Sequence, residues 1–244
     1  MPAFEYAIQA GVDVLELDLA VTKDDVLVAS HDPVLSETLC QGEGSTRIIR
    51  EMTLTDLRRW DCGAKRNPLF PKQEPVPGTR VPTLEEVLGL ASRGGFHFNI
   101  ETKIFRDKPQ YTPTPERFAQ LLVEIIKKHK LESRVIIQSF DFRTLVAAKK
   151  LAPEIRRAAL FEPGSKAVVA RTQEAGATIL SPHFLLVSAQ LVADAHKVGL
   201  QVIPWTANTA DVWDRLIRAE VDAIITDDPA ALIAHLKSKA ALQR

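Results

Sequence analysis

The sequence predicts an α/β fold of parallel strands joined by helices. Short apolar or β-branched runs alternate with amphipathic helical patterns almost to the end of the chain, which is typical of parallel strands with right-handed crossovers. Polar residues also gather at the C-terminal ends of several different strands. Because barrels build their sites at this end, the pattern favours a TIM-type (β/α) barrel over an open sheet.

The expected elements begin with a helix at Pro2–Ala10. Seven strands follow, at approximately Val14–Ala20, Phe96–Thr102, Val135–Ser139, Arg157–Phe161, Thr178–Ser181, Gln201–Trp205 and Ala223–Thr226. Helical patterns between them carry apolar residues at spacings of three and four, as at Phe118, Leu121, Leu122, Ile125 and Ile126. Neither a GxGxxG turn nor a P-loop follows any strand, which weakens a nucleotide-binding, doubly wound alternative. The strand count is one short of the eight of a complete barrel.

A long stretch rich in glycine and proline interrupts the alternation. We expect a lid or insertion there, at about residues 33–82, because long loops in compact domains are usually functional. Residues Phe105 to Pro115 form a second loop on the same rim. With 244 residues and 45% hydrophobic content, the chain is long enough for one barrel domain, 1–244, with a sizeable core.

Composition excludes several classes of partner. The chain has 31 basic and 31 acidic residues, so no global field favours nucleic acid or an anionic membrane surface. No apolar run approaches the roughly 20 residues needed to span a bilayer, and we expect a soluble chain. Cys40 and Cys62 fall in the loop-rich stretch, where a disulfide and two free thiols are equally compatible with the sequence.

The first strand carries two acids on one face. Glu16 and Asp18 lie two residues apart and so project to the same side, while Leu15, Leu17 and Leu19 face the other way. Enclosed carboxylates require a cation, and an all-oxygen ligand set suits Mg²⁺ or Ca²⁺ better than Zn²⁺. The alternative is an exposed edge strand with solvated acids.

A second strand repeats this arrangement. Glu101 and Lys103 lie two apart at the end of Phe96–Thr102. Two strands that each end in inward-pointing charges predict a shared metal and anion site, in which Glu101 joins the metal ligands and Lys103 binds phosphate or another anion.

Four further residues are candidates, and for His31 and Trp205 a structural alternative stays open. His31 either transfers a proton at neutral pH or ends a strand by hydrogen bonding to the adjacent loop. Ser139 is a candidate for contact with phosphate. Trp205, at a strand end, either contacts a substrate or caps the core. His183 follows a strand closely enough to reach the same pocket.

Short motifs in a fixed order carry a resemblance to a known family. They are Glu16-Leu-Asp18, Thr22-Lys-Asp24, Val28-Ala-Ser-His31-Asp32, Pro82-Thr-Leu-Glu-Glu-Val-Leu88, Asn99-Ile-Glu101-Thr-Lys103, Gln138-Ser-Phe140, Trp205-Thr-Ala-Asn208 and Thr226-Asp-Asp-Pro229. In this order and spacing the chain resembles the glycerophosphodiester phosphodiesterases over nearly its whole length. The resemblance implies a barrel of the phospholipase C-like phosphodiesterase kind and one metal ion, Ca²⁺ or Mg²⁺, on Glu16, Asp18 and Glu101. It also implies a catalytic role for His31 and phosphate contact by Lys103.

The chain departs from the family pattern at its start. Family members begin with a strand that ends in His-Arg-Gly and continue into Pro-Glu-Asn-Thr, whereas Met1-Pro-Ala-Phe-Glu-Tyr-Ala falls where their first helix begins. We therefore expect a first barrel strand, with a catalytic histidine and a phosphate-binding arginine, to be missing from this chain and its activity to be reduced.

The resemblance predicts an enzyme that hydrolyses glycerophosphodiesters, small-molecule substrates, to sn-glycerol 3-phosphate and an alcohol. Two alternatives remain: a sphingomyelinase D-like phospholipase, which needs a broad apolar rim, and a non-catalytic barrel that binds metal and phosphate. The sequence leaves open the alcohol, the metal, the oligomeric state and the compartment, cytoplasmic or exported.

Overall fold

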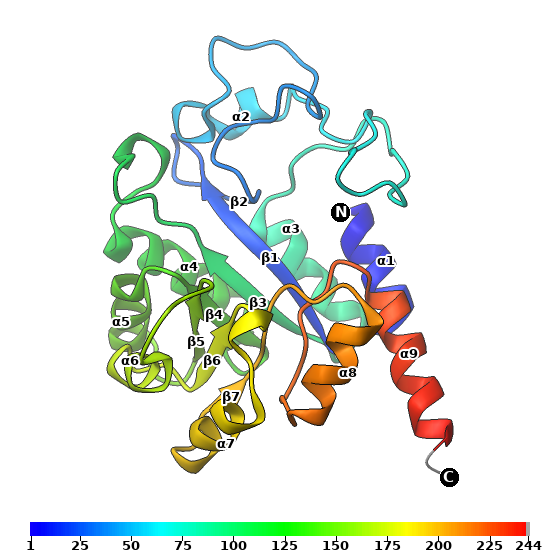
Figure 1. The fold of residues 1–244 in the computed structure, drawn as a ribbon. Helices are drawn as coiled ribbons and strands as arrows, with labels where there is room; N and C mark the ends of the chain where they lie inside the picture. The colour runs from blue at the N-terminus through cyan, green and yellow to red at the C-terminus, as the bar shows by residue number, and fades with distance from the viewer. Residues whose placement is uncertain (243–244) are drawn as a thin grey trace.

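The computed structural model describes residues 1–242 as one twisted sheet with helices packed against it (Figure 1). The strands are β1 (Val14–Val21), β2 (Leu27–Ala29), β3 (His97–Thr102), β4 (Val135–Ser139), β5 (Arg156–Phe161), β6 (Ile179–Pro182) and β7 (Gln201–Val202). The α-helices are α1 (Pro2–Ala10), α2 (Leu54–Leu57), α3 (Leu84–Leu88), α4 (Pro115–His129), α5 (Phe142–Leu151), α6 (Val168–Glu174), α7 (Ala189–Lys197), α8 (Ala210–Arg218) and α9 (Pro229–Leu242). Short 3-10 turns occupy Ile49–Glu51, Gly89–Arg93, Pro109–Tyr111, Glu132–Arg134 and Phe184–Leu186.

The sheet confirms the predicted alternation of parallel strands and helices. Its order is β2-β1-β3-β4-β5-β6-β7, and every neighbouring pair from β1 to β7 is parallel. Hydrogen bonds do not close this sheet into a ring within the described residues. The fold is of the α/β barrel class, and its sheet ends at β2 on one side and at β7 on the other.

Three strands differ from the sequence-based prediction. β7 keeps only Gln201 and Val202 of the predicted Gln201–Trp205. Ala223–Thr226 is not a strand. The Ile225 N–H donates to the Pro204 carbonyl, and the Ile225 carbonyl accepts from the Ala207 N–H. Both of these backbone hydrogen bonds join Ile225 to the segment that follows β7. The prediction also omitted β2, which pairs antiparallel with the end of β1. Three residues are too short a run to show a period in the sequence.

Local sequence explains where the well-formed helices begin and end. Helix α1 has proline in its first turn and ends at Gly11, whose φ of 88° is the left-handed conformation that glycine adopts without strain. Helix α4 begins after Thr114, whose hydroxyl accepts a hydrogen bond from the Arg117 N–H, and its apolar stripe is buried. The predicted helix at Pro2–Ala10 is confirmed.

Apolar side chains fill two layers around the strands. The large core lies between the sheet and the helices and includes Leu17, Phe98, Ile100 and Leu122. A small cluster of Ile136, Ala158 and Ile179 forms separately, on the opposite face of the strands. Because side chains alternate along a strand, Leu17 and Ile100 face the helices, and the acids that alternate with them face the interior of the barrel.

The segment between β2 and α3 has its own apolar cluster. Trp60, Leu57 and Ile49 are buried there, and Cys40 forms a disulfide with Cys62. The backbone packs closely: a Cβ at Gly42 would lie 2.8 Å from the Arg59 carbonyl oxygen. Figure 1 shows this segment beyond the C-terminal end of β1, where the predicted lid was placed.

Candidate functional site

Three acids meet inside the barrel, two on β1 and one near the C-terminal end of β3. Glu16 and Asp18 on β1 and Glu101 on β3 each present a carboxylate oxygen, and these oxygens lie within 4.8 Å of one another. The register explains the meeting, because Asp18 pairs directly with Glu101 and Glu16 lies two residues earlier on the same face. The predicted clustering of these acids is confirmed.

Lys103 lies at the edge of this acid cluster, which we define as Glu16, Asp18 and Glu101. Its Nζ is 3.1 Å from Asp18 Oδ1 and 3.0 Å from Glu101 Oε1. The lysine side chain is 13% exposed and the Glu101 side chain 8% exposed. The ammonium is therefore largely withdrawn from water and held by two carboxylates of the cluster.

The acid cluster shifts the pKa of its members. Burial is the largest cause that raises the pKa of Glu101 to about 8, and the nearby Asp18 adds to it although Lys103 opposes it. Burial, followed by the charges of Asp18 and Glu101, also raises the pKa of Glu16 well above its ordinary value. Burial lowers the pKa of Lys103, but Asp18 and Glu101 outweigh it and the net shift is upward. Such shifts are typical of buried carboxylates that lie close to one another.

The donor set fits one hard divalent cation. Three carboxylates carry three negative charges when ionised, Lys103 carries one positive charge, and a single divalent cation balances the two that remain. All the ligand atoms offered are oxygens, which is the set that Mg²⁺ and Ca²⁺ prefer.

The candidate residue Ser139 lies elsewhere, which corrects the expectation that it faces the site. Its side chain is fully buried, and its hydroxyl donates to the Thr102 carbonyl and accepts from the Asp141 N–H. The physical reason is the alternation along β4, which turns Gln138 toward the acid cluster and Ser139 toward the helices.

His31 lies after β2, beside the end of β1. The neighbouring Ser30 N–H bonds to the Asp18 carbonyl at 2.9 Å, which ties this turn to the strand that carries two of the acids. The His31 side chain is 72% exposed, and its Nδ1 is 2.9 Å from Asp32 Oδ1. The imidazole is therefore accessible to a substrate and has a carboxylate partner that can orient it.

Trp205 belongs to an aromatic group at the same end of the strands. Its ring centroid lies 5.4 Å from that of Phe140 and 5.1 Å from that of His183, both edge to face. The indole N–H donates to the Ser181 carbonyl at 3.0 Å. Phe140 keeps 39% of its surface exposed, so this group presents apolar surface to solvent. The sequence singled out Trp205 and His183 but did not predict their contact with Phe140.

Two polar residues inside the barrel belong to the motifs found in the sequence, but sequence reasoning gave them no role in the site. Asn99 on β3 and Gln138 on β4 are 4% and 2% exposed, and Gln138 donates to Glu16. The signal was present in the sequence, because Asn99 precedes Glu101 by two residues and so lies on the same face of β3.

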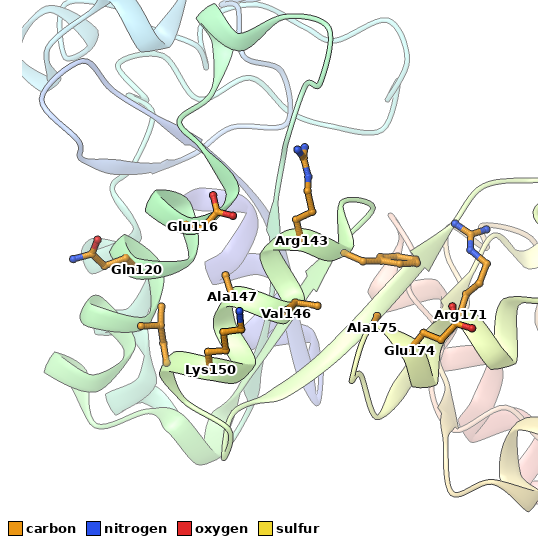
Figure 2. Close-up of a pocket in the computed structure, with 11 residues that line it drawn as sticks. Glu116, Gln120, Arg143, Val146, Ala147, Lys150, Arg171, Glu174 and Ala175 are labelled. Carbon is orange, nitrogen blue, oxygen red and sulfur yellow. The ribbon is translucent and has the colours of Figure 1, made fainter.

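A cavity of about 650 Å³ lies outside the barrel, away from these residues. Figure 2 shows its walls, formed by Glu116 and Gln120 of α4, by Val146 and Lys150 of α5, and by residues of α6 that include Arg171. None of the predicted site residues lines it. The cavity is thus separate from the acid cluster.

Comparison with known proteins groups this chain with phosphodiesterases. The glycerophosphoryl diester phosphodiesterase family model matches residues 1–231, and the chain belongs to that family. A glycerophosphodiester phosphodiesterase from Caldanaerobacter subterraneus subsp. tengcongensis is 35% identical over 231 residues, which cover 95% of this chain and 88% of the relative. Another from Bacillus subtilis is 32% identical over an alignment of 244 positions. This alignment covers 93% of this chain and 78% of the relative.

A solved structure supports the same grouping. The phosphodiesterase OLEI02445 of Oleispira antarctica, in complex with the product sn-glycerol-3-phosphate, superposes with a TM-score of 0.80 at 25% identity. The match covers 96% of this chain and 89% of that one.

Proposed function

We propose that this chain hydrolyses glycerophosphodiesters to sn-glycerol 3-phosphate and an alcohol, with one divalent cation, Ca²⁺ or Mg²⁺, on Glu16, Asp18 and Glu101. The observation that carries the proposal is the acid cluster, whose three carboxylates lie within 4.8 Å of one another with Lys103 beside them. The activity named for the family members above, and the sn-glycerol-3-phosphate in the Oleispira structure, support this substrate class.

The residues of this chain have distinct parts in the reaction. The cation, when bound, supplies positive charge to the phosphoryl oxygens. Lys103 contacts a non-bridging phosphate oxygen and stabilises the negative charge of the transition state. His31 either accepts the proton of the attacking hydroxyl or donates a proton to the leaving alkoxide oxygen. Trp205 and Phe140 pack against the carbon atoms of the substrate beside the phosphate.

Release of sn-glycerol 3-phosphate from glycerophosphocholine and glycerophosphoethanolamine tests this function directly. We expect chelation to abolish the release, and Ca²⁺ or Mg²⁺ to restore it. Glu16→Gln should lose both activity and cation affinity, whereas Glu124→Gln, an exposed acid on α4, should lose neither. Activity that persists after chelation would refute the cation assignment.

The expected reduction of activity stays a prediction. It is tested by comparing kcat of this chain with that of the same chain preceded by a strand that ends in His-Arg-Gly. Equal values of kcat would show that the described residues supply every proton transfer that the reaction needs.

The phospholipase alternative requires an apolar surface for a lipid at the mouth of the barrel. Phe140 of the aromatic group and Leu185, which follows β6, are exposed apolar residues at this end of the strands. Two separate side chains support a small alcohol better than a lipid tail. Hydrolysis of sphingomyelin or lysophosphatidylcholine vesicles at a rate above that of glycerophosphocholine would favour the alternative.

A further inference from the structure

A chain of two buried amides ends on one carboxylate of the acid cluster. Asn99 Nδ2 donates to Gln138 Oε1 at 2.8 Å, and Gln138 Nε2 donates to Glu16 Oε1 at 2.7 Å. The three residues come from β3, β4 and β1, so the Gln138 side chain reaches across β3 to meet an acid on the strand beyond it. We propose that Gln138 and Asn99 are positioning residues that hold the Glu16 carboxylate in the orientation that binds the divalent cation.

The direction of each hydrogen bond supports this role. A side-chain amide donates only through its nitrogen and accepts only through its oxygen. Because Asn99 donates to the Gln138 oxygen, the Gln138 nitrogen must point toward Glu16. That nitrogen binds one oxygen of the carboxylate, which leaves the other oxygen available to a cation. Residues that support a metal ligand from behind orient it in this way.

Burying these two polar side chains lowers the stability of the fold, which argues against a role in packing alone. Asn99 and Gln138 are 4% and 2% exposed, and Asn99 Oδ1 has no hydrogen-bond partner within the described residues. A buried acceptor without a partner destabilises the fold. Apolar side chains of similar size would fill the same space without this cost, but they could not hold a carboxylate.

Gln138 also links two ligands of the same cation. In the sheet it pairs with Glu101, while its side chain bonds to Glu16. A substitution at Gln138 therefore removes the hydrogen bond that orients the Glu16 carboxylate. It leaves Lys103 and its contacts with Asp18 and Glu101 in place.

The inference rests on the proposed function, since it assumes the cation site. The test is calorimetric titration of the whole purified chain with Ca²⁺ and with Mg²⁺, without substrate. We expect Gln138→Met, which keeps the length of the side chain and removes both polar atoms, to weaken cation affinity by about 10- to 100-fold. Asn99→Ala should weaken it less. The double variant should bind as weakly as Gln138→Met alone, because Asn99 acts through Gln138.

A matched control separates positioning from stability. Thr172 on α6 is fully buried, and its hydroxyl donates to the Val168 carbonyl, far along the chain from the acids. Thr172→Val should lower the melting temperature without weakening cation affinity. If Gln138→Met does not fold, the Asn99→Ala titration decides.

The outcomes distinguish this inference from the proposed function. If the wild-type chain binds neither cation, the proposed cation site is wrong and the inference falls with it. If the wild type binds and the Gln138 and Asn99 variants bind within twofold of it, only the positioning role is refuted. Equal weakening by Thr172→Val would also refute it, because the loss would then follow stability.

Discussion

Cation binding at the acid cluster should release protons, and the amount can be worked from the structure. Burial raises the pKa of Glu101 to about 8, with Asp18 adding to the shift and Lys103 opposing it. At pH 7 a carboxyl with that pKa is about 90% protonated, so a cation that binds Glu101 must displace about 0.9 proton. Burial also raises the pKa of Glu16 well above its ordinary value, so Glu16 adds to this release.

Cation affinity should therefore rise with pH. Below about pH 8 we expect an increase of about tenfold for each pH unit per proton displaced, and a plateau above that value. Titration calorimetry in two buffers of different ionisation enthalpy measures the protons released, and titrations at pH 6, 7 and 8 measure the affinity. An affinity that does not change over this range, with no proton release, would refute the account of the acid cluster.

The same shift predicts the stability of the cation-free chain. A carboxyl whose pKa is higher in the folded than in the unfolded state binds its proton more tightly when folded, so stability falls as pH rises from about 4.5 to about 8. Each pKa unit corresponds to about 1.4 kcal/mol, which gives an upper bound of about 5 kcal/mol for Glu101. Glu101→Gln cannot ionise and should remove most of this dependence. Chemical denaturation at pH 5 and pH 8 in the presence of a chelator measures it.

Three further perturbations have defined outcomes. His31→Ala should lower phosphodiesterase activity by about 10²- to 10⁴-fold and leave cation affinity unchanged, because its part is proton transfer; a fall of less than about threefold contradicts that part. Reduction of the Cys40–Cys62 disulfide, or Cys40→Ser with Cys62→Ser, should lower the free energy of unfolding by about 3 kcal/mol and speed proteolysis of the segment between β2 and α3; unchanged melting and proteolysis would count against the disulfide. Burial raises the pKa of Asp141, but hydrogen bonds from Arg143 and others outweigh it and hold the pKa at about 2, so Asp141→Asn should cost about 2 kcal/mol at pH 7 and progressively less as pH falls from about 4 to about 2.

Much of the sheet could be predicted because its strands are buried on both sides. Val135–Ser139 is buried at every position, and such a strand appears in the sequence as a continuous apolar run. The end of the sheet could not be read in this way. β7 retains two residues of the five predicted, and Ala223–Thr226 forms no strand, because a ladder depends on a neighbouring backbone that local residue types do not specify.

The site shows the same division between local and long-range information. The acids at Glu16, Asp18 and Glu101 could be predicted because alternation fixes which face each side chain occupies. The same rule, applied to β4, excludes Ser139 once Gln138 is placed inside. The link from Gln138 to Glu16 joins residues 122 positions apart, and only the folded sheet brings them together.

The pairing of β1 accounts for the difference in exposure among the three acids. Glu101 lies on β3, which pairs with β1 on one side and β4 on the other, and it is 6% exposed. Glu16 and Asp18 are partly exposed, and their strand pairs with β2 only from Leu19 onward; from Val14 to Leu17 its sole ladder partner among residues 1–242 is β3. Charged groups are desolvated most where strands flank them on both sides. By surface exposure Glu101 is therefore the most enclosed of the three acids, on the side of the site nearest β4.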